Sequence, residues 1–97
     1  MAKAIGVLET KGLVALVKGV DAMLKAADVS LVGQYKDMGS AYMSATISGD
    51  VASVKSAVEA GANAAGEAGE VLSVHVIARP HEGLADAFAP KAPAAKK

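Results

Sequence analysis

The order of two hydrophobic periods along these 97 residues most constrains the fold. Apolar residues recur every three or four positions over 13–27 and 51–65, which is typical of helices with one apolar face. Shorter apolar runs are typical of strands. They lie at 4–8, 30–35, 42–47 and 71–79. The order strand, helix, strand, strand, helix, strand predicts an α+β fold, a ferredoxin-like sandwich with both helices on one face of an antiparallel sheet.

Capping residues mark the expected helix ends. Thr10 is expected to cap the first helix, whose apolar stripe we assign to Leu13, Leu16, Val17, Val20, Met23, Leu24 and Ala27. Asp50 is expected to cap the second helix, and Gly66 and Gly69 to end it.

The last strand leads into a basic corner. Alternation places His75, Ile77 and Arg79 on one face of it, and Val74, Val76 and Ala78 on the other. Pro80 cannot donate to a sheet, so the strand should stop there and display Arg79, whose planar fork suits carbonyls or carboxylates on another surface. The corner therefore indicates an interface anchor.

Length and composition favour association over ligand capture. We predict one domain over 1–88, with a short helix at 82–88, and a disordered Ala/Pro/Lys tail over 89–97. A domain of this size gains from oligomerisation. Hydrophobic residues make up 53% of the chain but aromatics only 3%, so close, flat contacts are favoured over a deep pocket.

The residues that catalysis needs are scarce. The chain has no Cys, and His75 and His81 lie about 20 Å apart in an extended strand, too far for a ready metal chelate. No nucleophile stands out with a base, so we expect no enzyme, no metal and no cofactor. A formal net charge of zero disfavours nucleic acid and anionic membranes. With no long apolar run and no signal-peptide pattern, we expect a soluble cytoplasmic protein.

Four separated motifs carry a family resemblance. They are Glu9-Thr10-Lys11-Gly12, the segment Asp21–Ala27, Gly49-Asp50-Val51, and the segment from Gly69 to Arg79-Pro80-His81. Together they resemble the single-domain shell proteins of bacterial microcompartments, which share the BMC domain. The resemblance implies cyclic homohexamers that tile with neighbouring hexamers and other shell proteins around cargo enzymes, with a central pore for small polar metabolites.

The same resemblance implies the residues of the contact between hexamers. These are Lys25, Asp28, Arg79, Pro80 and His81. Asp28 stands where relatives often carry Asn, one turn after Lys25, so a Lys25–Asp28 pair is expected. Because exposed charges are screened by salt, contact between hexamers should then be more salt-sensitive than in relatives with Asn.

The resemblance also places one loop around the six-fold axis. Its residues are Lys36, Asp37, Met38, Gly39, Ser40 and Ala41. Symmetry would turn one Ser40 hydroxyl per chain into a polar ring. Ala41 replaces a frequent Gly, and the loop region is one residue longer than in common relatives. Without the resemblance, the same residues read as an ordinary hairpin turn that needs Gly39 for positive φ.

One other functional class fits the fold. A ferredoxin-like regulatory module that dimerises and senses a small molecule would have the same element order. Among shells, the catabolic type is weakly favoured over the carboxysome, because Lys36 is the only cation that the loop adds.

Overall fold

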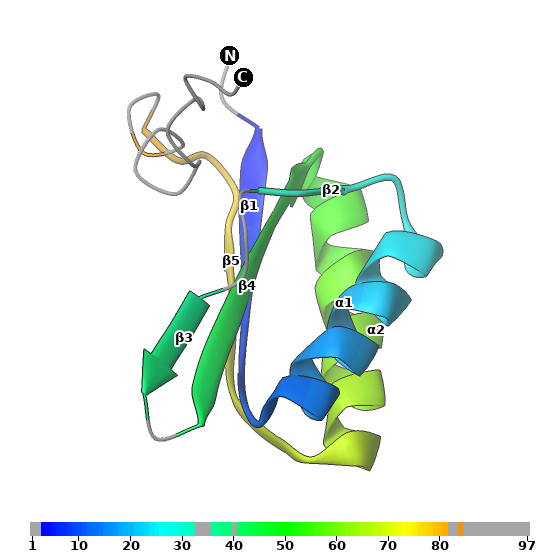
Figure 1. Ribbon diagram of the computed structural model, residues 1–97. Coiled ribbons are helices and arrows are strands. Elements are labelled where there is room, and N and C mark those ends of the chain that lie inside the picture. The colour runs from blue at the N-terminus through cyan, green and yellow to red at the C-terminus, as the bar shows by residue number, and fades with distance from the viewer. Residues whose placement is uncertain (1–2, 33–35, 40, 82–83, 85–97) are drawn as a thin grey trace, which may run out of the picture.

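Two helices cover one face of an antiparallel sheet in the computed structural model (Figure 1). The structure describes residues 3–32, 36–39, 41–81 and 84, and only the backbone of 36–39. The elements are β1 (Ala4–Lys11), α1 (Leu13–Ala26), β2 (Ser30–Leu31), β3 (Lys36–Gly39), β4 (Tyr42–Gly49), α2 (Val51–Ala68) and β5 (Glu70–Ile77). The sheet order is β2-β4-β1-β5, with β3 also paired to β4. The predicted ferredoxin-like architecture is confirmed.

Of the expected second strand, 30–35, the structure describes residues 30–32, and Ser30–Leu31 form β2 on the outer edge of β4; β3 follows on the same edge, beyond the expected strand. Ser30 pairs with Ser48 in β2, and Asp37 pairs with Met43 in β3. Residues 36–39 were expected in a loop, and that prediction is wrong, because β4 is long enough for its outer edge to pair with their backbone. Gly39 pairs with Tyr42, which leaves a loop of only two residues between β3 and β4.

The core lies between the helices and the inner face of the sheet. The largest fully buried side chains on this side come from both helices and from β1 and β4: Leu8, Leu16, Met23, Ile47 and Val54. Gly6 of β1 faces α2, and a Cβ there would lie 2.8 Å from a Val54 methyl carbon. The absence of a side chain at Gly6 therefore lets α2 approach the sheet closely.

The helix ends differ from prediction at two of the four residues predicted there. Asp50 caps α2 as expected, and its carboxylate accepts the Ser53 N–H at 2.9 Å. Thr10 does not cap α1, because it lies inside β1 and Gly12 holds the N-cap position. Gly66 lies inside α2, which continues to Ala68 before Gly69 ends it.

The last strand is shorter than predicted. β5 ends at Ile77, so Ala78 and Arg79 lie beyond it in a bend rather than on its two faces. Within the strand the predicted alternation is confirmed, since Val76 packs against the core while His75 is exposed on the opposite face.

The predicted helix at 82–88 lies outside the described residues except for Leu84, whose N–H donates to the His81 carbonyl at 2.9 Å. The predicted tail, 89–97, lies outside them entirely. Over the described part of the chain, neither helix combines the length and the apolarity that a membrane crossing requires.

Candidate functional site

The two regions singled out in the sequence lie at opposite ends of the sheet (Figure 1). At one end Lys11 pairs with Tyr42, beside the turn between β3 and β4. At the other end Ala4 pairs with Gly49, near the point where β5 leads into Arg79. Seven residue steps along β1 separate these ends by roughly 24 Å. The turn and the basic corner are therefore separate surfaces.

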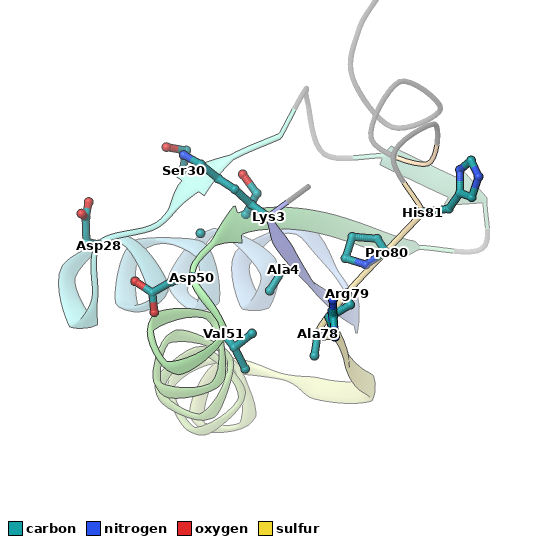
Figure 2. A pocket seen from close by; sticks show the side chains of 12 residues that line it. Lys3, Ala4, Asp28, Ser30, Asp50, Val51, Ala78, Arg79, Pro80 and His81 are labelled. Carbon is teal, nitrogen blue, oxygen red and sulfur yellow. The ribbon is translucent and has the colours of Figure 1, made fainter. Parts of the chain in front are cut away.

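A broad groove of about 1050 Å³ brings four of the five predicted edge residues together (Figure 2). It is formed where four chain segments converge: the start of β1, the connection from α1 to β2, the junction of β4 with α2, and the segment after β5. The predicted residues that line it are Asp28, Arg79, Pro80 and His81. Lys3 and Asp50 line it as well.

The groove carries balanced charge. Two carboxylates, Asp28 and Asp50, face it together with the cations of Lys3 and Arg79. Hydrogen bonds from the backbone N–H and the hydroxyl of Ser53 lower the pKa of Asp50 below its usual 3.8, so that carboxylate stays charged at neutral pH. Arg79 is exposed, whereas Pro80 is buried.

Lys25 lies outside this groove. Its ammonium pairs with the Asp21 carboxylate at 2.9 Å, and both side chains are largely exposed. The expected Lys25–Asp28 pair is not formed among the described residues, because α1 ends at Ala26 and Asp28 no longer lies on its surface. An exposed pair one helical turn apart, such as Lys25 with Asp21, contributes only about 0.3–0.5 kcal/mol.

The turn between β3 and β4 is tied to the start of α1. The Gly12 N–H donates to the Ala41 carbonyl at 2.6 Å. Ala41 has φ 67°, a positive value at a residue other than glycine. Ser40 and the side chains of Lys36, Asp37 and Met38 lie outside the described residues, and their predicted place at a pore stays a prediction.

An exposed apolar surface on α1 was not anticipated from the sequence. Leu13, Val17 and Leu24, all assigned to the core stripe, are 46%, 50% and 44% exposed. Neighbouring Val14 is 65% exposed. The residues of α1 that the core buries are Ala15, Leu16, Gly19 and Met23. The apolar arc is therefore wider than one packed face needs, and its unusual width was the signal available in the sequence.

The described residues contain no group of three or more His, Asp or Glu side chains placed to hold a metal ion.

On the outer face of the sheet, the Ser73 hydroxyl donates to the Glu9 carboxylate across β5 and β1. Ser73 and Glu9 are paired across the two strands, so this hydrogen bond is a cross-strand contact.

Comparison with known proteins gives a consistent result. The BMC domain model matches residues 4–80. The bacterial microcompartment shell protein EutM of Salmonella typhimurium is 52% identical over 86 residues, which cover 89% of this chain and 88% of that protein. PduA of Citrobacter freundii is also a microcompartment shell protein. It is 52% identical over 81% of this chain and 84% of the length of PduA. The carboxysome shell protein CcmK2 of Synechocystis is 49% identical over 87% of this chain and 82% of that protein.

A solved structure agrees with these relatives. A microcompartment protein from Desulfitobacterium hafniense superposes with a TM-score of 0.77 at 32% sequence identity, over 95% of this chain. This chain spans about half of that protein, 51% of its length. The predicted resemblance is confirmed: the chain belongs to the BMC domain family, together with single-domain microcompartment shell proteins.

Proposed function

We propose that this protein is a structural, non-catalytic component of a bacterial microcompartment shell, built as a cyclic homohexamer that tiles with its neighbours. Membership of the BMC domain family and relatives that are shell proteins support the shell role. The observation that carries the tile geometry is the placement of the turn after β3 and the basic corner at opposite ends of the sheet. In a cyclic tile one end of each subunit must face the axis and the other the rim.

The exposed apolar residues of α1 favour contact between copies of the chain. Leu13, Val14, Val17 and Leu24 expose large side chains on one helix of a small domain. Apolar surface of this kind is stabilised when another surface covers it, at about 25 cal/mol per Å². In the proposed hexamer a neighbouring subunit covers it.

The groove is the proposed contact between hexamers. Asp28, Arg79 and His81 line it, and Lys25 lies near the C-terminal end of α1, at the same end of the molecule. Its exposure and its position beyond the end of β5 support this role for Arg79, whose guanidinium would donate to carbonyl groups of another hexamer.

The segment from Lys36 to Ala41, which ends in the turn between β3 and β4, is the proposed pore rim. Six Ser40 hydroxyls around one axis would present a polar ring that suits small polar metabolites. Ser40→Leu should then alter metabolite passage while hexamers and sheets still form. Loss of the hexamers in this variant would count against the pore assignment.

Molar mass by light scattering, followed by electron microscopy, tests the proposal. We expect a particle of six times the 9.6 kDa chain that associates into sheets or tubes with six-fold tiles. A compact dimer that saturates with a small molecule would contradict it and favour the regulatory ferredoxin-like module.

A further inference from the structure

Gly12 connects the proposed pore turn to the buried core. Its N–H donates to the Ala41 carbonyl at 2.6 Å, and its own carbonyl accepts the Thr10 hydroxyl at 3.2 Å. Leu16 N–H lies 3.4 Å from the same carbonyl, in the first turn of α1. The residues Thr10, Gly12 and Ala41 are here called the Gly12 bridge.

The bridge is anchored at one end in the core. Thr10 is 0% exposed and lies in β1 between Met43 of β4 and Val71 of β5. A buried hydroxyl needs a hydrogen-bond partner, and the Gly12 carbonyl provides it. The orientation of Gly12 is therefore fixed by a side chain that cannot move without disturbing the central strands.

The other end of the bridge holds a strained residue. Ala41 has φ 67°, a conformation that costs an L-residue free energy relative to glycine. Such a conformation persists only where the surroundings impose it, and the Gly12 N–H is the described group that bonds the Ala41 carbonyl. Gly12 has φ 98° itself, so its own conformation suits glycine.

We propose that Thr10 and Gly12 are positioning residues for the pore, because the Gly12 bridge fixes where the turn between β3 and β4 lies. This inference rests on the proposed hexamer with that turn at its axis. In the hexamer any displacement of the turn would occur six times around the axis, so a small local shift changes the width of the pore. The core thereby sets the aperture through one buried hydroxyl and one backbone hydrogen bond.

Distances between turns across the hexamer test this inference. The chain contains no Cys, so Tyr42→Cys, at an exposed site next to Ala41, gives a single spin-label position per subunit. Hexamers assembled with a small fraction of labelled chains give distance distributions by double electron-electron resonance. We expect a narrow distribution, with the short distances of a site near the axis, in the otherwise unchanged protein.

Two variants perturb the bridge and two controls leave it intact. Gly12→Ala strains the backbone although a Cβ would meet no atom within 4 Å, and Thr10→Val removes the hydroxyl while keeping the β-branched shape. Both should broaden the distribution or shift its mean. Thr10→Ser restores the hydroxyl and should restore the narrow distribution. Gly66→Ala, another glycine with open space around its Cβ position, should leave it unchanged.

The outcomes separate the two proposals. If hexamers form with short label distances, but Gly12→Ala and Thr10→Val leave the distribution as narrow as before, the bridge does not position the turn and the pore assignment stands. If the labels in the parent hexamer lie at rim distances, or no hexamer forms, the pore assignment fails and the positioning role fails with it. Broadening by Thr10→Val that Thr10→Ser does not reverse would also overturn the inference.

Discussion

Gly19 and Gly61 face each other where α1 crosses α2. A Cβ built on Gly61 would lie 3.0 Å from the Gly19 carbonyl oxygen, and one built on Gly19 would lie 3.1 Å from the Gly61 carbonyl oxygen. On each side a side-chain atom lies closer still, from Met23 for Gly61 and from Leu8 for Gly19, but the facing carbonyl is backbone and cannot turn aside as a side chain can. The pair therefore sets how closely the two helices pack over the sheet.

Gly61→Ala should destabilise the fold by about 1–3 kcal/mol, because the added methyl group meets the Gly19 carbonyl and the Met23 side chain. Gly66→Ala is the matched control in the same helix, where the added methyl group meets no atom within 4 Å and should stabilise by about 0.5–1 kcal/mol. Chemical denaturation at one fixed chain concentration measures both. Equal shifts in the two variants would show that the helix crossing tolerates the methyl group.

Val17→Lys should prevent assembly without unfolding the chain. Val17 is 50% exposed on the apolar surface of α1, so its replacement places a charge in the proposed subunit interface and leaves the core intact. Asn63→Lys introduces the same side chain on the exposed face of α2 and should assemble normally. Light scattering gives the masses, and circular dichroism checks the fold. A fully assembled Val17→Lys variant would mean that this surface has another role.

Ala41→Gly should stabilise the chain by about 1 kcal/mol. Its φ of 67° is strained for alanine and ordinary for glycine, and this gain outweighs the greater freedom of glycine in the unfolded chain. The backbone carbonyl that Gly12 bonds is retained. A lower denaturation midpoint than in the parent protein would show that Ala41 is not strained.

Acid should remove the extra stability that Asp50 gives the fold, compared with asparagine at the same position. Ser53 stabilises the carboxylate, so the folded pKa lies below the usual 3.8. For a lowered pKa the stabilisation is complete above that usual value and is lost as the pH falls through the folded pKa. Asp50→Asn still caps α2 but does not titrate. The melting temperature of the parent protein should therefore exceed that of the variant at neutral pH, and the difference should shrink below about pH 4. A difference independent of pH would contradict this.

Asp28→Asn should make sheet formation less sensitive to salt. Asp28 lines the same groove as Arg79 and adds a charge at the proposed contact between hexamers, where ions screen it. Glu59→Gln removes an exposed charge elsewhere, on α2, and serves as the control. Turbidity or sedimentation across a range of ionic strengths gives the comparison. The idea fails if both variants and the parent protein respond to salt alike.

Local patterns predicted the parts of the fold that local chemistry decides. Asp50 was identified as a cap because its carboxylate needs only the Ser53 N–H, three residues away. Thr10 was misassigned because a threonine before a helix looks like a cap, whereas pairing with Met43 and Val71, far along the chain, keeps it in β1. The pairing of β2 and β3 with β4 likewise depends on residues of β4 farther along the chain, and no nearby residue reveals it.

For the candidate surfaces too, the sequence revealed individual residues, whereas the contacts between them depend on the fold. The segment from Arg79 to His81 was evident from its composition and from the end of a strand, but its place beside Asp28 and Asp50 in one groove depends on segments far apart in the sequence that converge in space. Lys25 was expected beside Asp28, although the helix ends between them and Asp21 is its partner. The Gly12 bridge had no signal beyond a glycine, since its partner Ala41 is brought near by strand pairing.

Electron cryomicroscopy of the assembled sheets tests the central claim most directly. The proposal predicts hexagonal tiles in which the turn between β3 and β4 surrounds each six-fold axis, while Arg79 lies at the two-fold contact between hexamers. Tiles with Arg79 at the six-fold axis and the turn at the rim would contradict it, as would particles that remain dimeric at every concentration.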